Sequence, residues 1–437
     1  MVPDIFHRDF TPQPFWWEAY RPTAGELVEV PRSARVAIVG GGYAGLSTAL
    51  ELAKHGIDAI VLEAGELGSG ASTRNGGAVS GGVNIGKSFT GRTADAEAGR
   101  AEQLLSDASD AFALIDRLIN EEKINCFWET PGRFVGAWTR KHFEAQARRL
   151  AMLNSAAQSG AHLVPRGRQR EEIASDYYFG GMVVERSGKL HPALYYKGLL
   201  EACRRRGVAV CARAPVTSIR RTGAEWRIET GRGALAAGDA VIATNGYTGG
   251  LAPDLRRRVV PVASHIIATE ELPQNLAQSL IPRGRTLSDT KRVLCYYRMS
   301  PDGTRMVFGG RARFTQVDPT ASGPILYRYM TDRFPQLRGV KITHAWTGNV
   351  AFTLDALPHM GKRDGLHYCL GCNGSGVAMM TYLGWQTARK IARIANFACS
   401  FDTEDFPGHP LYFGNPWFLP IAGGYYRLRD NLDRLLT

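Results

Sequence analysis

The feature that most constrains this chain is a glycine-rich turn between an apolar strand and a helix. Residues 36–39, Val-Ala-Ile-Val, have the composition of a short buried strand. Residues 46–55 carry apolar side chains at helical spacing before Gly56 ends the helix. A second apolar strand follows at residues 59–62 and ends at Glu63. This order of elements predicts a βαβ unit with parallel strands.

The spacing within the turn is typical of a dinucleotide site. In Gly40-x-Gly42-x-x-Gly45 the first glycine permits the tight turn and the second lets backbone amides approach a pyrophosphate. The third lets helix and strand pack closely, and the helix N-terminus stabilises the phosphate charge. Glu63 lies 21 residues after Gly42, where a carboxylate accepts hydrogen bonds from ribose hydroxyls. The pattern predicts a bound dinucleotide and leaves open whether it is FAD or NAD.

Composition sets the class of protein. The chain has 437 residues, 44% of them apolar and 22% charged, which is ordinary for a globular protein with more than one core. No apolar run has the length of a membrane span. Residues 1–22 lack the basic start and apolar stretch of a secretory signal. We therefore expect a cytoplasmic enzyme.

The net charge and the cysteines give limited information about the ligands and the cellular compartment of the protein. The formal net charge is +12, which fits an anionic substrate, an anionic cofactor, a membrane surface or nucleic acid. The seven cysteines are loosely spaced, which suits a reducing compartment. Cys369 and Cys372 form a C-x-x-C pair, but no second ligand pair accompanies them, so we expect no metal site.

Three further segments distinguish between the cofactors. Residues 70–77 read Gly-Ala-Ser-Thr-Arg-Asn-Gly-Gly, Gly246-Tyr247 ends a late strand, and residues 371–377 read Gly-Cys-Asn-Gly-Ser-Gly-Val. Together they resemble the D-amino-acid-oxidase-like superfamily of FAD-dependent oxidoreductases, of the glycine and sarcosine oxidase type. The chain is most similar to the γ-glutamylputrescine oxidase branch, and the similarity covers nearly its whole length. That similarity rests on Arg74–Gly77, Phe308–Gly310, Trp346–Gly361 and Asn415–Phe418.

The resemblance implies an α/β fold with two domains. A Rossmann-like FAD-binding domain is expected beside a second, substrate domain built on a mostly antiparallel sheet. Residues 35–92, 193–250 and 345–399 are expected to form the FAD-binding domain, and residues 93–192 and 251–344 the substrate domain. Residues 1–34 form an N-terminal arm whose aromatic cluster, Phe15-Trp16-Trp17, should pack onto the body. Residues 400–437 form a C-terminal tail.

The resemblance also implies which residues hold a non-covalent FAD. The glycine turn and Glu63 are assigned to the ADP half, and the segment after the second strand to the pyrophosphate and the flavin edge. The start of the last long helix is assigned to the flavin pyrimidine edge, where a helix N-terminus stabilises negative charge on a reduced flavin. The predicted residues are Gly40, Gly42, Tyr43, Ala44, Gly45, Glu63, Ala64, Ala71, Ser72, Arg74, Asn75, Gly76, Gly77, Val216, Thr244, Gly246, Gly348, Gly374, Ser375, Gly376 and Val377.

On the substrate side, the resemblance implies oxidation of a C–N bond in a primary or secondary amine. Hydride would pass to flavin N5, the imine would hydrolyse, and O2 would reoxidise the flavin with release of H2O2. Two positions depart from the pattern. Val350 replaces the arginine that clamps the substrate carboxylate in glycine and D-amino-acid oxidases, and Val307 replaces the lysine that serves oxygen reactivity in sarcosine oxidases.

Other side chains become candidates for the missing roles, each with an ordinary structural role as the alternative. Arg298, Arg311 and Arg313 are candidates for binding a substrate carboxylate. A guanidinium donates two parallel hydrogen bonds to a carboxylate. His265 and Tyr297 are candidates for the pocket wall, and His359 for a loop near the flavin. These residues and the net charge favour an anionic substrate such as iminodiacetate or another N-substituted glycine. A polyamine derivative is the other substrate class that we consider.

Three alternatives stay open at this point. One is an amine dehydrogenase that passes electrons to a quinone or carrier, favoured by Val307 and by the apolar tail 416–426, which also allows peripheral membrane contact. Another is a tRNA-modifying flavoprotein, because related domains work on tRNA and the chain is basic. No RNA-binding module is recognisable, so a nucleic-acid partner is not expected. The last alternative is a flavin-binding sensor without enzymatic activity.

Overall fold

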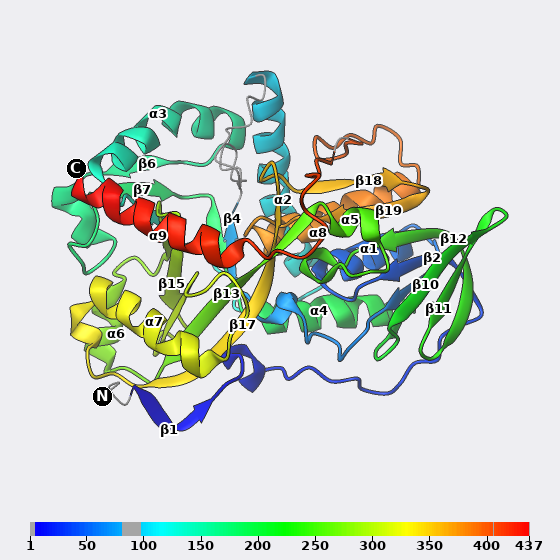
Figure 1. Cartoon of the computed structure of the whole chain (residues 1–437), viewed down its shortest axis with the longest axis horizontal. Coiled ribbons are helices and arrows are strands. Elements are labelled where there is room, and N and C mark those ends of the chain that lie inside the picture. Colours follow the sequence, from blue (N-terminus) through cyan, green and yellow to red (C-terminus); the bar gives the residue numbers. More distant parts are fainter. Residues whose placement is uncertain (1–4, 81–97, 405, 437) are drawn as a thin grey trace.

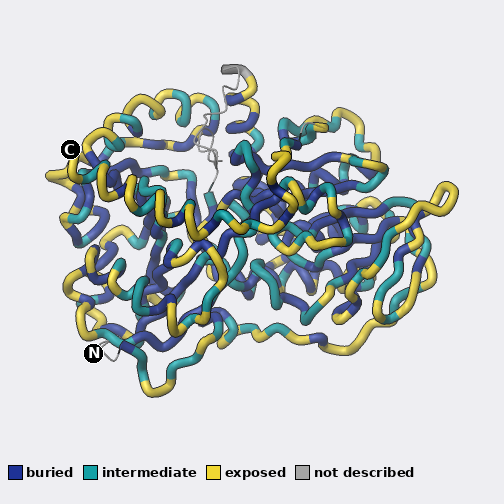
Figure 2. The backbone as a smooth tube through the Cα atoms, in the orientation of Figure 1, coloured by how far each residue is buried: buried dark blue, intermediate teal, exposed yellow. Residues whose placement is uncertain are grey.

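The computed structural model of the chain describes residues 5–80, 98–404 and 406–436. Figure 1 shows two lobes, each built on one large sheet, with the N-terminal arm running along both. The helices are α1 (Tyr43–Lys54), α2 (Ala98–Glu121), α3 (Arg140–Ala157), α4 (Pro192–Arg205), α5 (Pro253–Arg256), α6 (Gln274–Leu280), α7 (Pro319–Arg333), α8 (Gly376–Ile391) and α9 (Leu419–Leu435). Figure 2 shows that the buried segments concentrate in the two sheets and in the helices that cover them.

The first lobe contains an eight-stranded sheet with a parallel centre in the order β19-β12-β2-β3-β9. Its strands are β2 (Ser33–Val39), β3 (Ala59–Leu62), β9 (Ala209–Cys211), β12 (Gly233–Ile242) and β19 (Leu366–Leu370), joined antiparallel by β10 (Val216–Thr222), β11 (Glu225–Thr230) and β18 (His359–Arg363). The strand residues 36–39 and 59–62 are buried, as their continuous apolar runs predict. Helix α1 packs against both α4 and α8 and completes the predicted βαβ unit.

The second lobe contains a nine-stranded sheet in the order β1-β17-β13-β16-β15-β14-β5-β7-β6. Its strands are β1 (Phe6–Thr11), β5 (Arg133–Gly136), β6 (His162–Val164), β7 (Gly181–Val184), β13 (Val259–Thr269), β14 (Thr286–Asp289), β15 (Cys295–Met299), β16 (Met306–Gly310) and β17 (Ile342–Thr353). All neighbouring pairs are antiparallel except β1 with β17 and β14 with β5. The predicted fold class is therefore confirmed.

The residue boundaries of the two predicted domains stay a prediction. Strand β17 crosses the expected boundary at residue 345 and pairs with β13 from Val259 to Thr269 in the second sheet. A small two-stranded sheet, β4 (Ala78–Ser80) with β8 (Ser187–Lys189), lies outside both large sheets. Two stretches of the predicted domains lie outside the described residues: 81–92 of the FAD-binding domain and 93–97 of the substrate domain.

The N-terminal arm packs onto the body through its aromatic cluster, as predicted. Trp16 is fully buried, and Phe15 is buried beside it against residues of β13, β16 and β17. Strand β1 of the arm extends the second sheet by pairing parallel with β17. The arm thereby touches the strand that carries the motif Trp346, which places it close to the functional site.

The C-terminal tail contains a helix that the sequence did not indicate. In Figure 1, α9 lies across the lobe that holds the nine-stranded sheet. The pair Gly423–Gly424 lowers intrinsic helix propensity, but buried contacts on the inner face outweigh this cost. Asp430 is buried and accepts hydrogen bonds from the backbone amides of Arg292 at 3.0 Å and Val293 at 2.9 Å. The tail is thereby fixed to the second lobe.

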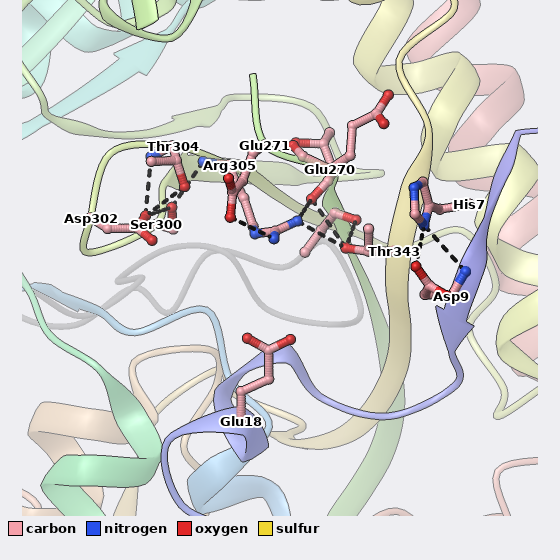
Figure 3. Close-up of polar contacts among 12 residues, drawn as sticks. His7, Asp9, Glu18, Glu270, Glu271, Ser300, Asp302, Thr304, Arg305 and Thr343 are labelled. Atoms are coloured by element: carbon pink, nitrogen blue, oxygen red, sulfur yellow. Dashed lines mark hydrogen bonds and ion pairs between the residues drawn. The ribbon is translucent and has the colours of Figure 1, made fainter. Parts of the chain in front are cut away.

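A polar cluster at one edge of the second sheet fixes the turn between β15 and β16 (Figure 3). Arg305 donates to the carbonyl of Thr269 and to the carboxylate of Glu271, both at 3.0 Å. The backbone amide of Arg305 also donates to the hydroxyl of Ser300 at 2.9 Å. Glu18, on the arm, points toward this cluster in Figure 3. These contacts hold the register of two strands that form the wall of the cavity described next.

Candidate active site

A single large cavity lies between the two sheets. Its volume is about 1180 Å³, and it runs from the Gly40–Ala44 turn to the face of the nine-stranded sheet. This is more space than a drug-sized ligand usually fills, so a dinucleotide and a small molecule fit together. Among the described residues, no group of three or more His, Cys, Asp or Glu side chains is placed to hold a metal ion.

Steric contacts explain why Gly40 and Gly45 of the turn are glycines. Gly40 has a φ of 108°, and a Cβ atom there would lie 2.8 Å from the carbonyl oxygen of Ala243. A Cβ atom at Gly45 would overlap the carbonyl oxygen of Gly40. Glu63 accepts hydrogen bonds from the amides of Gly41 at 2.8 Å and Gly65 at 3.0 Å, so the acid also holds the loop. The turn is thus shaped by backbone contacts that exclude larger side chains.

Nearly all predicted cofactor residues line this cavity. The two exceptions are Gly45, which packs behind the turn, and Gly246, whose Cβ position faces Asn349 at 3.3 Å. The others converge on one space, and they come from the turn after β2, the start of α1, the 63–77 segment, β10, the loop after β12, β17 and the start of α8. Their individual contacts with a cofactor stay predictions.

Three tryptophans anchor the predicted flavin segment. The indole of Trp16 donates to the carbonyl of Asn75 at 2.8 Å, and that of Trp346 donates to the carbonyl of Arg74 at 2.8 Å. The indole of Trp17 donates to the hydroxyl of Thr73 at 2.9 Å, and the guanidinium of Arg74 lies over its ring at 4.6 Å. From the sequence, these tryptophans were predicted only to pack or to belong to a motif. No local pattern indicated that their indoles would hydrogen-bond to the segment 73–75.

Two helix N-termini open onto the cavity. Gly42 is the N-cap of α1, whose first amide, that of Tyr43, donates to the Ser72 hydroxyl at 3.1 Å, and Ser375 is the N-cap of α8, where its side chain accepts no cap hydrogen bond. Both helix dipoles therefore favour an anionic ligand. Gly374 has a φ of 92°, and a Cβ atom there would meet nothing within 4 Å, so the space in front of α8 is open. These features fit FAD, whose pyrophosphate is anionic and whose reduced ring carries negative charge.

The wall opposite these loops is the face of the second sheet. Tyr296 on β15 and Ser264 on β13 share a hydrogen bond of 2.8 Å between their hydroxyls, and both line the cavity. A Cβ atom at Gly76 would lie 2.8 Å from the Tyr296 ring, so this tyrosine adjoins the predicted flavin segment. Burial raises the pKa of Tyr296 to about 12. Its hydroxyl is therefore protonated at neutral pH and available as a hydrogen-bond donor.

Arg311 is the predicted catalytic candidate that lines the cavity. Its guanidinium lies 4.7 Å from the ring centre of Phe352 and donates to the carbonyl of Arg292 at 3.1 Å. Phe352 is two residues beyond Val350 on β17, and Val350 faces Val262 across the strand pair. No described carboxylate forms an ion pair with Arg311, and burial lowers the pKa of its guanidinium. An arginine from the end of β16 therefore approaches the wall where Val350 stands.

The other four candidates are buried and do not line the large cavity. Arg298 donates to the carbonyls of Leu190 at 2.8 Å and Gly77 at 3.2 Å, so it supports the flavin segment from behind. Tyr297 bonds to Tyr178 on the opposite face of the sheet from Tyr296. His265 contacts Thr347 at 3.2 Å, and His359 contacts Asp355 at 3.0 Å. The residues that do line the wall, Ser264, Tyr296 and Phe352, were not among the predicted site residues.

Two buried histidines are expected to make the fold sensitive to acid. Burial lowers the pKa of both His191 and His265 to about 4, against about 6.5 in the unfolded chain. Protons therefore bind the unfolded state first, and the free energy of unfolding falls as the pH drops from about 6.5 to about 4. The loss is up to roughly 3 kcal/mol for each histidine.

Urea unfolding at pH 7.5, 6 and 5 measures this effect. His265→Gln should flatten the pH dependence, and the matched change His162→Gln, at a half-exposed histidine, should leave it unchanged. An identical slope in wild type and His265→Gln would contradict the assignment.

The fold and the cavity together define a dinucleotide-binding enzyme with a separate substrate wall. Residues 35–390 match the family model described as DAO, FAD dependent oxidoreductase, and the chain belongs to that family. It is 33% identical over 408 residues to gamma-glutamylputrescine oxidoreductase of Escherichia coli (strain K12), covering 91% of this chain and 93% of that protein. The predicted family, the FAD cofactor and the enzyme class, an FAD-dependent oxidoreductase, are confirmed.

Solved structures agree on the fold. Glycine oxidase from Geobacillus kaustophilus superposes with a TM-score of 0.72 at 20% identity, over 87% of this chain and 99% of that one. Iminodiacetate oxidase from Chelativorans sp. BNC1 superposes with a TM-score of 0.66 at 17% identity, over 82% of this chain and 95% of that one. At these identities the likeness establishes the arrangement of the two sheets.

Proposed function

We propose that this enzyme oxidises a C–N bond of a primary or secondary amine that carries a carboxylate, such as an N-substituted glycine. The observation that carries the proposal is the position of Arg311 in the wall of the cavity that also contains the predicted flavin segment. A partly buried guanidinium without a described carboxylate partner is stabilised when an anionic ligand binds. Gamma-glutamylputrescine and iminodiacetate, in the names of two similar proteins, are both carboxylated amines.

The side chains of the wall suit an amine held in its neutral form. Val262, Val350 and Phe352 present apolar surface beside Arg311, and a low local dielectric disfavours an ammonium ion. Arg311 would fix the carboxylate end, while the Tyr296–Ser264 pair bounds the position of the reacting carbon. Bound FAD would supply the acceptor for the hydride that leaves the carbon next to nitrogen. The imine product would then hydrolyse.

A peroxide-release screen tests both the reaction class and the acceptor. The panel contains primary amines, polyamine derivatives and N-substituted amino acids, each with and without a carboxylate. We expect peroxide from at least one carboxylated amine and much less from its uncarboxylated analogue. Turnover of uncarboxylated amines alone would overturn the anionic part of the proposal.

One observation favours a second candidate, an amine dehydrogenase that delivers electrons to a membrane quinone. The outward face of α9 carries Ile421, Tyr425, Leu428, Leu432 and Leu435, exposed by 39–81%. Their spacing of four and three residues forms a continuous apolar stripe, which soluble proteins rarely leave in water without a use. Within the described residues, no helix combines the length and apolar character of a membrane span. The stripe therefore supports contact with a membrane surface, while a cytoplasmic location stays a prediction.

Vesicle binding is the prediction that follows for this surface. Each exposed leucine that enters the interface contributes on the order of 1.5 kcal/mol, so the double variant Leu428→Ser/Leu432→Ser should bind anionic phospholipid vesicles at least tenfold more weakly. The matched control Asn431→Ser changes an exposed, uncharged residue of the same helix outside the stripe. Equal sedimentation of wild type and double variant, together with rapid reoxidation by air, would exclude the quinone route.

A further inference from the structure

A second arginine lines the same cavity on the far side of Tyr296. The sheet order β16-β15-β14-β5 places Arg133 three strands from Arg311, with Tyr296 between them. Ser288 on β14 is the direct partner of Tyr296 on β15. The Nε and Nη2 groups of Arg133 donate to the Ser288 hydroxyl at 3.0 and 2.6 Å. Arg133, Ser288, Tyr296 and Arg311 all line the cavity, so they form one polar row across the sheet.

No described carboxylate forms an ion pair with Arg133, although Asp289 lies close enough to oppose the effect of burial on the pKa of its guanidinium. Two other guanidiniums of the second lobe are paired with carboxylates, Arg285 with Glu172 at 2.8 Å and Arg333 with Asp289 at 2.5 Å, whereas Arg298 bonds to backbone carbonyls. Arg133 has only the Ser288 hydroxyl as a hydrogen-bond partner in the described chain, which leaves most of its five N–H donors unused. Burial also lowers the pKa of its guanidinium.

Charged side chains of both signs line the cavity. Lys291 is one of them, and its ammonium lies 4.3 Å from the ring centre of Trp138. Of the acidic side chains that line the cavity, Glu63 lies at the dinucleotide end, and Asp289 is paired with Arg333. A partly buried guanidinium without an ion-pair partner, in a cavity that a lysine also lines, favours an anion supplied by the ligand.

We propose that Arg133 and Ser288 form a second carboxylate subsite, so that the substrate is an amine with an acidic group on each side of the oxidised C–N bond. This rests on the proposed function and names its substrate class. Three strand spacings, about 14 Å, separate the strands that carry the two arginines. A small dicarboxylated amine spans that distance when each carboxylate meets one guanidinium. Its nitrogen would then lie beside Tyr296 and Gly76, next to the predicted flavin segment.

The test compares ligands with one and two carboxylates on the FAD-loaded enzyme. Thiodiacetate and (methylthio)acetate are sulfur analogues that lack the amine, and their binding is followed by the change in flavin absorbance. Arg133→Gln should raise the Kd of thiodiacetate at least thirtyfold, as expected for a lost charge-assisted pair. It should change the Kd of (methylthio)acetate less than twofold, and Arg133→Lys should restore part of the binding of thiodiacetate.

Controls separate the subsite from a general effect on the fold. Arg140→Gln removes a 78% exposed arginine at the start of α3 and should change neither Kd. Flavin content and thermal unfolding of Arg133→Gln should match wild type. A loss of binding for both ligands to the same degree would overturn the proposal, because Arg133 would then only shape the cavity.

Steady-state kinetics on two amines distinguish a failure of the second subsite from a failure of the proposed function. If iminodiacetate is turned over, Arg133→Gln should lower its kcat/KM at least thirtyfold and leave N-methylglycine unaffected. If amines are oxidised but this difference is missing, the second subsite is wrong and the proposed function stands. If no amine reduces the flavin, the proposed function fails, and the thiodiacetate measurement still decides whether Arg133 binds a second carboxylate.

Discussion

Gly45→Ala is expected to yield a folded protein with less than about a tenth of its FAD. The added Cβ atom would overlap the carbonyl oxygen of Gly40, and neither atom can rotate away, because the Cβ is fixed by the helix backbone and the oxygen belongs to the backbone of the turn. Helix α1 must then move from the turn that precedes it, which displaces the amides that face the pyrophosphate. Overpacking of this kind also costs about 1–3 kcal/mol of stability. The ratio of flavin to protein absorbance after purification measures the first effect, and thermal unfolding the second.

Gly424→Ala is the matched control for this change. Gly424 lies within α9, and a Cβ atom there would meet nothing within 4 Å. Alanine has the higher helix propensity, so stability should rise slightly and flavin content should not change. Full flavin occupancy in Gly45→Ala would show that the turn tolerates a side chain, and the assignment of the dinucleotide site to it would be wrong.

Arg311→Met is expected to lower kcat/KM for carboxylated amines by about a hundred- to a thousandfold. Loss of a buried, hydrogen-bonded charge pair costs about 2–5 kcal/mol, and about 1.4 kcal/mol corresponds to a factor of ten. Methionine keeps much of the apolar contact with Phe352 while it removes the charge. Flavin content should stay at the wild-type level, because Arg311 stands on the sheet wall and not among the predicted cofactor residues.

Steady-state kinetics on paired substrates separate charge recognition from a distorted cavity. An uncarboxylated amine should lose less than threefold in Arg311→Met, and exposed Arg338→Met should change neither substrate. An equal loss for both amines in Arg311→Met would contradict the role of Arg311 as the carboxylate clamp.

The dinucleotide end of the site was predictable because its requirements are local. The positive φ of Gly40 and the contact between Gly45 and the Gly40 carbonyl arise within a few residues of sequence. The spacing to Glu63 follows from the length of one helix and one strand. A βαβ unit therefore leaves a pattern in the sequence that needs no knowledge of the rest of the chain.

The substrate wall was not predictable in the same way, because it depends on which face of each strand meets the cavity. Tyr296 and Tyr297 are neighbours with similar chemistry, and successive side chains of a strand point to opposite faces. Tyr296 faces the cavity and Tyr297 packs on Phe308 behind it. Arg298 and Arg311 differ for a related reason: one binds backbone carbonyls behind the flavin segment, and the other reaches the wall from beyond the end of β16.

The anchoring of the flavin segment was hidden for a third reason, sequence distance. Trp16 and Trp346 donate to the neighbouring carbonyls of Asn75 and Arg74, although they lie 59 residues before and 272 residues after them in the sequence. Such contacts arise only after the arm and β17 have both been placed against the glycine-rich segment.

The measurement that tests the central claim most directly is anaerobic reduction of the bound flavin by an amine panel. The purified enzyme, loaded with stoichiometric FAD, is mixed with each amine in the absence of oxygen, and the visible absorbance band of oxidised flavin is followed. We predict that a carboxylated amine bleaches this band rapidly in wild type, and at least a hundredfold more slowly in Arg311→Met. A fully loaded enzyme whose flavin is bleached by none of the amines would contradict the assignment of this cavity to amine oxidation.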